Sequence, residues 1–192
     1  MSSYLHKEPA LYWIFEKALD DNICEKILSL GKNEFKKAKI GYGSSGSDDK
    51  KIRDSSIVWL SEQWVFDMVF SYMNVANKNA GWEIDVDAAE SMQLTKYKKK
   101  GFYSFHKDGG GFETYNKPGN TFLHNKSRKL SMTALLNDEF EGGGFEFYNV
   151  PELKMNKGDI VFFPSFELHR VNPVTKGVRH SLVTWFVGPK FK

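Results

Sequence analysis

Residues 1 to about 81 carry a hydrophobic pattern that predicts two short strands and two helices. The strands are expected at Leu11–Leu19 and Ser56–Leu60. Asn22 with Glu25 is typical of a capping box, so the first helix is expected to begin there and to end at Gly31. Each predicted helix follows one of the predicted strands.

The second helix is expected from a Ser61 cap to about Lys78, with Trp64, Met68 and Tyr72 along one face. The stretch Gly41–Lys51 is rich in Gly, Ser and Asp, and its composition predicts a loop.

From Trp82 onward, short β-rich stretches alternate with turns rich in Gly, Asn and Pro. The expected strands are Glu90–Tyr97, Phe102–His106, Leu130–Leu136, Phe145–Val150, Ile160–Phe163, His169–Val171 and Arg179–Val187. This many short strands predict a β-sandwich or barrel with the two helices packed on one face. We therefore expect one mostly-β domain over residues 1–192, with a helical part at about 1–81 and a β core at about 82–189.

Composition and charge exclude several classes of protein. Hydrophobic residues make up 41% and charged residues 27%, as in ordinary globular chains, while the aromatic share of 15% predicts a core or pocket built from rings. The net charge of +3 and the small number of arginines disfavour a nucleic-acid partner. Cys24 is the only cysteine, which excludes an internal disulfide and a Cys-rich zinc site.

The cellular setting follows from the same features. No apolar run approaches the roughly 18 residues of a membrane span, so no membrane partner is expected. The lone cysteine favours a reducing compartment, which means the cytoplasm, or the host cytoplasm for a viral protein. The sequence leaves open whether the protein is a monomer or a homodimer.

The candidate chemistry lies in His106 and Asp108, which end one predicted strand. Residues two apart in a strand point to the same side, with Cα atoms roughly 6.5–7 Å apart, so both side chains can reach one metal ion. By itself the pair also fits a surface histidine near a turn. Its context favours a site, because Gly109–Gly111 follows and His169 opens a later strand. Two histidines and one carboxylate form the facial triad of non-haem Fe(II), and a guanidinium such as Arg179 can bind the carboxylate of a chelating cosubstrate.

The region from about Gln93 to Pro189 resembles the 2-oxoglutarate/Fe(II)-dependent oxygenases of the prolyl 4-hydroxylase-like and PKHD-type branch. The stretches that carry the resemblance are Tyr97–Asp108, Leu136–Asp138 with Glu141–Gly143, Gly158–Pro164 and His169–Arg179. This resemblance implies a double-stranded β-helix, a cupin-like jelly-roll barrel with the metal inside one end. It also implies that His106, Asp108 and His169 are the iron ligands and that Arg179 pairs with the C5 carboxylate of 2-oxoglutarate.

Other pocket residues follow from the resemblance with alternatives left open. Tyr97 matches a tyrosine that often touches the cosubstrate, and Tyr103 is a second candidate, although both also fit ordinary core packing. Many prolyl hydroxylases carry a tyrosine where this chain has Leu135. The missing hydrogen bond is expected from Thr133 or Tyr97, and the resemblance does not decide between them. Apart from the resemblance, the segment Gly109–Lys129 follows the ligand pair and is rich in Gly and Asn, so it is expected to cover the pocket and contact substrate, with a disordered surface loop as the alternative.

The resemblance implies an Fe(II)- and 2-oxoglutarate-dependent dioxygenase that uses O₂, with ascorbate as an optional reductant. Its substrate would be a prolyl or other residue in a protein or peptide, with succinate and CO₂ as coproducts. A free amino acid or other small molecule is the alternative substrate. A non-oxidative jelly-roll binding module or a metal-dependent isomerase is the alternative from another class, and succinate formation would separate it from the oxygenase.

Overall fold

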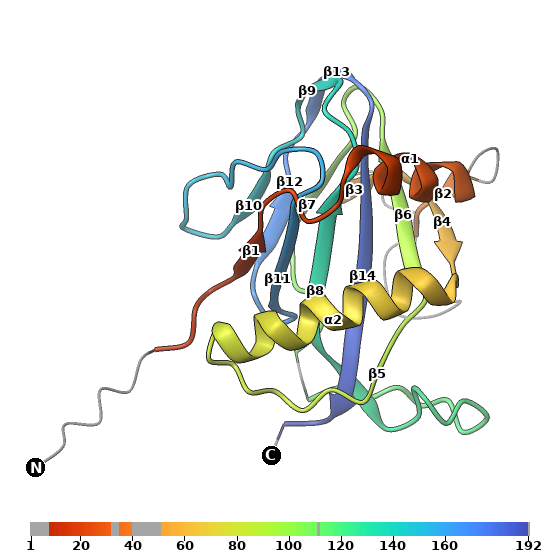
Figure 1. Cartoon of the computed structure of the whole chain (residues 1–192), viewed down its shortest axis with the longest axis vertical. Helices are drawn as coiled ribbons and strands as arrows, with labels where there is room; N and C mark the ends of the chain where they lie inside the picture. The colour runs from red at the N-terminus through yellow and green to blue at the C-terminus, as the bar shows by residue number, and fades with distance from the viewer. Residues whose placement is uncertain (1–7, 32–34, 40–50, 111, 192) are drawn as a thin grey trace, which may run out of the picture.

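The computed structural model describes residues 8–31, 35–39, 51–110 and 112–191. Nearly all of the predicted loop Gly41–Lys51 lies outside the described residues. Two facing β-sheets form the body of the protein, and two helices cover the outer face of the larger sheet (Figure 1). This is the expected mostly-β, double-stranded β-helix class. Within the described residues the two sheets remain separate ladders, so they form a sandwich rather than a closed barrel.

The larger sheet has the strand order β1-β11-β8-β14-β6-β4-β2, with β5 paired to β14. Its strands are β1 (Trp13–Phe15), β11 (Ile160–Pro164), β8 (Lys126–Leu135), β14 (Arg179–Pro189), β6 (Met92–Tyr97), β4 (Ser56–Leu60), β2 (Lys36–Lys37) and β5 (Ala88–Ala89). All of its pairings are antiparallel. The long strands β8 and β14 lie side by side at its centre.

The smaller sheet has the order β10-β12-β7-β3, and a separate ribbon pairs β13 with β9. Their strands are β10 (Phe145–Phe147), β12 (His169–Val171), β7 (Phe102–His106), β3 (Arg53–Asp54), β13 (Val174–Gly177) and β9 (Phe140–Gly142). The pairs β12–β7 and β12–β10 are antiparallel as well. Because β7 and β12 are distant in sequence, their pairing joins two parts of the chain at one place.

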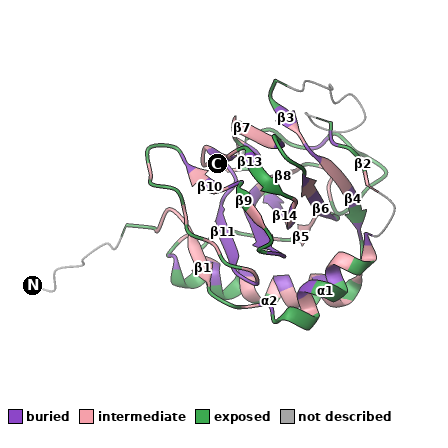
Figure 2. Cartoon of the chain, turned by 90° about the horizontal axis from the view of Figure 1, so that it is seen from above, coloured by how far each residue is buried: buried purple, intermediate pink, exposed green. Residues whose placement is uncertain are grey.

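The helices are α1 (Asp21–Leu30) and α2 (Gln63–Asn79), and their inward faces are the buried ones (Figure 2). Asp20 caps α1 by accepting a hydrogen bond from the Ile23 amide at 2.8 Å. The prediction of a cap at Asn22 is therefore wrong, because an aspartate two residues earlier takes that role. Gly31 ends α1 as predicted, and a Cβ there would lie 2.4 Å from a Leu94 methyl group.

The buried stripe of α2 lies one residue beyond the predicted one. Val65, Val69, Met73 and Ala76 are buried, whereas the predicted Trp64, Met68 and Tyr72 are half-buried and flank them. Small aliphatic side chains let the helix approach the sheet closely, so the large rings occupy the sides. The predicted Ser61 cap is also wrong, because Glu62 precedes the first helical residue and makes no side-chain cap.

Strict alternation along the large sheet creates two separate cores. On β11, Ile160 and Phe162 pack against the helices, while Val161 and Phe163 point between the two sheets. On β14, Leu182 and Phe186 face the helices. Successive strand residues point to opposite faces, so Ser181, Val183 and Trp185, which line the space between the sheets, face the smaller sheet. The space between the sheets is therefore lined partly by strand residues that are polar.

Strand positions agree with the sequence except where strands are short and at the start of β8, which begins at Lys126, four residues before the predicted Leu130. The predicted boundaries of β4, β7 and β12 are confirmed, but the strand expected at Leu11–Leu19 is reduced to β1. Five short strands were not predicted: β2, β3, β5, β9 and β13. Trp59 is 53% exposed, because it lies on the face of β4 opposite the buried Val58 and Leu60. Among the described residues, no helix is long and apolar enough to cross a membrane.

Packing of β11 against the helices should dominate the stability of the fold. Phe162 is fully buried and its ring contacts Phe15 and Phe186. We expect Phe162→Ala to lower the free energy of unfolding by about 3–5 kcal/mol, because it leaves a cavity. Phe122 is 72% exposed, and Phe122→Ala should change stability by less than about 0.5 kcal/mol. Equal losses in denaturant unfolding of the two variants would contradict this account of the core.

Candidate metal centre

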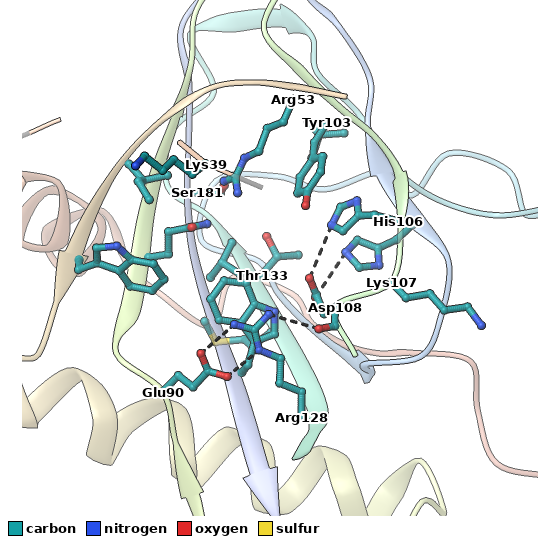
Figure 3. Close-up of a pocket in the computed structure, with 18 of the residues that line it drawn as sticks. Lys39, Arg53, Glu90, Tyr103, His106, Lys107, Asp108, Arg128, Thr133 and Ser181 are labelled. Carbon is teal, nitrogen blue, oxygen red and sulfur yellow. Dashed lines mark hydrogen bonds and ion pairs between the residues drawn. The ribbon is translucent and has the colours of Figure 1, made fainter. Parts of the chain in front are cut away.

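Pairing of β7 with β12 brings two histidines together. His106 ends β7, His169 begins β12, and the two residues are direct partners in the antiparallel ladder. Directly opposed residues of an antiparallel pair lie on the same face. Both imidazoles therefore project into the space between the sheets, with ring centroids 4.2 Å apart. Figure 3 shows His106 pointing toward Asp108 in this space.

Asp108 completes the cluster two residues after the end of β7. The backbone amides of Asp108 and Gly109 each donate to the Ser165 carbonyl at 3.0 Å, which holds this segment against the chain that follows β11. One carboxylate oxygen lies 3.6 Å from His106 Nε2 and the other lies 3.5 Å from His169 Nε2. One ligand atom from each of the three residues lies within 4.8 Å of the others, so a single ion can be reached by all three.

Hydrogen bonds at the far side of each imidazole leave the correct nitrogen available. His106 Nδ1 lies 2.8 Å from the Ser104 carbonyl, and His169 Nδ1 lies 2.9 Å from the Glu167 carbonyl. A carbonyl can only accept, so each Nδ1 carries a proton, and in the neutral form of each ring Nε2 keeps its lone pair. Such outer hydrogen bonds orient metal-binding histidines in general. The donor set therefore fits a divalent metal ion.

Protonation states in the cluster suit metal binding as well. Burial lowers the pKa of His169 to about 4, with His106 acting in the same direction and Asp108 opposing. Burial raises the pKa of the Asp108 carboxyl, but His169, His106 and Arg128 outweigh it and hold the pKa well below its usual range. At neutral pH the site therefore presents a neutral His169 imidazole beside an ionised carboxylate.

Aromatic rings surround the cluster and limit access of water. Tyr103 stacks on His106 with ring centroids 3.5 Å apart, and Phe145 and Phe163 contact His169 at 5.5 and 4.6 Å. Burial raises the pKa of Tyr103, with Arg53 opposing, so its hydroxyl stays protonated at neutral pH. The predicted pocket position of Tyr103 agrees with this stacking.

A pocket of about 890 Å³ opens between the two sheets from the cluster of His106, Asp108 and His169. The predicted residues Tyr97 and Thr133 both line it, together with His106, Asp108 and His169. Tyr97 is 4% exposed and pairs with Arg179 across β6 and β14. Leu135 is buried on the same face of β8 as Thr133, two residues away, so the leucine adds an apolar surface there.

Arg179 lies behind the pocket wall. It is 1% exposed, donates from Nη1 to Ser181 Oγ at 3.0 Å, and lies over the Tyr97 ring at 5.6 Å. Ser181 and Tyr97 line the pocket, and Arg179, which contacts both, is not among the lining residues. Burial lowers its pKa. No carboxylate of the described residues forms an ion pair with it, so the alternative of an internal salt bridge finds no support there.

A second polar cluster in the pocket was not predicted from the sequence. Arg128 donates to both carboxylate oxygens of Glu90, at 2.6 and 2.8 Å, and to the Asp108 carbonyl at 3.2 Å. Its guanidinium also lies 3.8 Å from the ring centre of Trp185, and Tyr115 donates to Glu90. The Glu90–Arg128 pair thus connects β8, the segment before β6 and the backbone of Asp108.

The small number of arginines in the chain is the sequence signal that could have pointed to Arg128 as a pocket residue. Only four arginines occur in the chain, and Arg53 and Arg128 line the pocket while Arg179 lies directly behind it. Arg170 is the exception, because it pairs with Glu146 on the smaller sheet. In a lysine-rich chain, an arginine marks a position that needs a planar, always charged group.

Part of the segment Gly109–Lys129 is held in place by the buried Tyr115, which lines the pocket. Tyr115 is 8% exposed and its amide donates to the Lys126 carbonyl, while Phe112 and Phe122 are 68% and 72% exposed. Tyr115 and Lys117 line the pocket, so part of this segment borders it. Contact of the segment with substrate stays a prediction.

A jelly-roll sandwich that holds two histidines and an aspartate at one end of its inner pocket defines a class of metal-binding proteins, and comparison with known families agrees. The model of the 2OG-Fe(II) oxygenase superfamily matches residues 92–187, which is half of the chain. The match contains His106, Asp108, His169 and Arg179. The chain therefore belongs to the 2OG-Fe(II) oxygenase superfamily.

Similar sequences come from bacteria. A PKHD-type hydroxylase of Xylella fastidiosa (strain 9a5c) is 38% identical over 94 residues, which cover 46% of this chain and 40% of that protein. A PKHD-type hydroxylase of Colwellia psychrerythraea is 56% identical over 32 residues, covering 17% of this chain and 14% of that protein. The chain thus matches less than half the length of these relatives.

Solved structures agree in fold over nearly the whole chain. The viral collagen prolyl hydroxylase of Paramecium bursaria Chlorella virus-1, solved with 2OG, has a TM-score of 0.67 and 19% identity, covering 93% of this chain and 97% of that one. A Trichoplax adhaerens prolyl hydroxylase, solved with a hypoxia inducible factor peptide fragment, has a TM-score of 0.68 and 16% identity, covering 92% and 83%. The likeness extends through the N-terminal helices, which the family model does not cover.

Metal binding by the cluster can be measured through stability. A ligand at 100 times its dissociation constant stabilises a folded protein by about 2.7 kcal/mol. We expect Mn²⁺, as an air-stable substitute for Fe²⁺, to raise the melting temperature of the wild type but not of His106→Ala or Asp108→Ala. His180 points to the opposite face and packs on Phe35, so His180→Ala should keep the Mn²⁺ response. An undiminished response in the first two variants would rule out this ligand set.

Proposed function

We propose that the protein is an Fe(II)- and 2-oxoglutarate-dependent dioxygenase that hydroxylates a prolyl residue in a protein or peptide. The observation that carries the proposal is the convergence of His106, Asp108 and His169 at the inner end of a pocket that also has a buried arginine behind its wall. Membership of the 2OG-Fe(II) oxygenase superfamily supports it. The non-oxidative binding module is less well supported, because it does not require this donor set.

His106, Asp108 and His169 would hold the iron through two Nε2 atoms and one carboxylate oxygen. With iron, 2-oxoglutarate and O₂ bound, the site would oxidise a C–H bond and release succinate and CO₂. The chain itself contributes orientation and exclusion of water. The Ser104 and Glu167 carbonyls keep the imidazoles in place, and the ring of Tyr103 covers the His106 side of the centre.

Arg179 would bind the distal carboxylate of 2-oxoglutarate. Its guanidinium is buried without an ion-pair partner among the described residues, and a buried charge is costly until an anion reaches it. Ser181 already receives one of its hydrogen bonds, so a cosubstrate carboxylate would meet a donor held in a fixed direction. Tyr97 and Thr133 border the same part of the pocket and would supply hydroxyl groups where Leu135 has none.

A peptide substrate fits the pocket better than a free amino acid. The volume of about 890 Å³ is near the upper end of small-molecule pockets, which span roughly 300–1,000 Å³. Trp185 Nε1 lies in the pocket wall and is buried without a hydrogen-bond partner among the described residues. A substrate carbonyl could accept that hydrogen bond. The Trichoplax enzyme of the same fold was solved with a peptide bound, which favours the same class of substrate here.

The proposal is tested by incubating the enzyme with iron, ascorbate, 2-oxoglutarate and proline-containing peptides. We expect succinate to form and the mass of a peptide to rise by that of one oxygen atom, with fragmentation placing the oxygen on proline. Succinate formation stimulated only by free amino acids would assign a small-molecule substrate instead. Absence of succinate with iron bound would overturn the dioxygenase assignment altogether.

Removal of Arg179 should affect the cosubstrate and leave the metal in place. A charge-assisted hydrogen-bonded pair contributes about 1.5–3 kcal/mol, so we expect Arg179→Ala to weaken 2-oxoglutarate binding by about 10- to 150-fold. Titration of the Mn²⁺-loaded variant with 2-oxoglutarate measures this directly. His169→Ala should instead abolish turnover at any cosubstrate concentration.

A matched control is Arg170→Ala, because Arg170 is paired with Glu146 outside the pocket lining. That variant should bind 2-oxoglutarate like the wild type. If Arg179→Ala lowers only thermal stability and leaves the 2-oxoglutarate dependence unchanged, the residue is structural and its cosubstrate role is wrong.

A further inference from the structure

The pocket concentrates positive charge far beyond the average of the chain. Of its 26 lining residues, seven are Lys or Arg and two are Asp or Glu, which gives the lining a net charge of +5. Because the whole chain carries +3, all remaining residues together sum to −2. The cationic lining residues are Lys36, Lys37, Lys39, Arg53, Lys107, Lys117 and Arg128.

Binding of the metal and cosubstrate would not neutralise this excess. A divalent ion and the dianion of 2-oxoglutarate cancel each other, so the charge of the lining stays as it was. Glu90 already forms an ion pair with Arg128, and Asp108 belongs to the candidate metal site. Lys36, Lys39 and Lys117 form no ion pair with the described residues. These three exposed lysines form the charged mouth of the pocket.

Strand pairing places an exposed tryptophan on the face of the sheet that carries Lys36. Lys36 is the ladder partner of Ile57, and partners in an antiparallel pair share a face. Trp59 lies two residues beyond Ile57 on the same side of β4 and is 53% exposed. Its ring lies 6.2 Å from that of Trp185, which lines the pocket wall. The mouth thus combines lysines with an apolar surface.

We propose that this mouth selects protein substrates whose target residue is flanked by acidic residues, with carboxylates meeting Lys36, Lys39 and Lys117 and an apolar side chain packing on Trp59. The proposal rests on the proposed function, because the target residue must reach the metal cluster. Tryptophan is a frequent anchor in protein interfaces, and charges at a rim govern the rate and specificity of association. The chemical class of the partner is therefore an acidic peptide segment with at least one apolar residue.

Lysines also attract phosphates, but a nucleic acid fits this mouth less well. The two arginines of the lining are both engaged within the protein: Arg128 with Glu90, and Arg53 with Ser55 Oγ at 2.8 Å and the Tyr103 ring. That leaves no free guanidinium for bidentate phosphate or base contacts. One exposed tryptophan also gives a single stacking surface, whereas single-strand binders stack successive bases on several aromatic side chains.

Binding of labelled peptides to the full chain, loaded with Mn²⁺ and 2-oxoglutarate under argon, tests the proposal. The peptides share a central proline and an adjacent leucine and differ only in their flanks, which are acidic, neutral polar or lysine-rich. We expect fluorescence anisotropy to give the tightest binding for the acidic flanks, and this preference should shrink between low salt and about 0.15 M salt. Free glutamate and a single-stranded RNA serve as competitors.

Charge reversal then locates the effect. Lys36→Glu/Lys39→Glu should weaken binding of the acidic peptide by about 10-fold, since each exposed ion pair contributes up to about fivefold to the affinity. Lys36→Gln/Lys39→Gln should give an intermediate loss, which guards against a misfolded reversal variant. The control Lys98→Glu/Lys99→Glu changes the net charge equally on exposed residues outside the lining, and it should bind like the wild type.

Trp59→Ala separates the apolar contact from the charges. This variant should weaken binding of the acidic and neutral peptides by the same factor, whereas the lysine variants should weaken binding of the acidic peptide alone. Equal binding of all three peptides, equal effects of the Lys98/Lys99 control, or stronger competition by RNA or free glutamate than by unlabelled acidic peptide would each overturn the proposal. Turnover of 2-oxoglutarate is measured alongside, so that loss of the acidic preference with intact turnover refutes this inference alone.

Discussion

Antiparallel pairing between β7 and β12 is the constraint on which the rest of the site depends. The ladder sets His106 opposite His169 and forces both rings to the inner face of the smaller sheet. The turn after β7 then needs only two residues to bring Asp108 between them, and two amide hydrogen bonds to the Ser165 carbonyl fix that turn. A shift of the register by one residue would turn one imidazole away from the pocket. The candidate metal site formed by His106, Asp108 and His169 is thus a consequence of strand register.

Alternation along the large sheet supplies the other half of the pocket. One face of β8 and β14 is apolar and packs on the helices, which gives the sheet its stability. The opposite face carries Ser131, Thr133, Arg179 and Ser181, all of which are buried. Buried polar groups are tolerated because they bond to each other, as Ser131 does with Ser165 Oγ at 2.9 Å and Arg179 with Ser181. The same two strands therefore provide both the core and a polar pocket wall.

The long strands and the candidate metal-binding residues could be predicted from the sequence because both rest on local patterns. Stretches rich in β-branched and aromatic residues, separated by turn residues, mark β6, β7, β8, β11 and β14 directly, and the His-x-Asp spacing needs one strand only. The short strands β2, β3 and β5 have two residues each, too few for any period, and exist because a longer neighbour pairs with them. The first helix cap was misplaced for a similar reason, since Asp20 and Asn22 are both good caps and packing decides between them.

Residues whose role depends on several strands at once could not be predicted from their spacing along the sequence. Glu90 and Arg128 lie 38 residues apart and meet only because β6 and β8 both pair with β14. The Gly142-Gly143 pair shows the same limit, since it contributes to the resemblance but its purpose appears only in three dimensions. Gly143 has φ +66°, and a Cβ there would lie 3.0 Å from Arg179 Cδ. The motif thus leaves room for the arginine behind the pocket wall, which links the turn after β9 to Arg179 on β14.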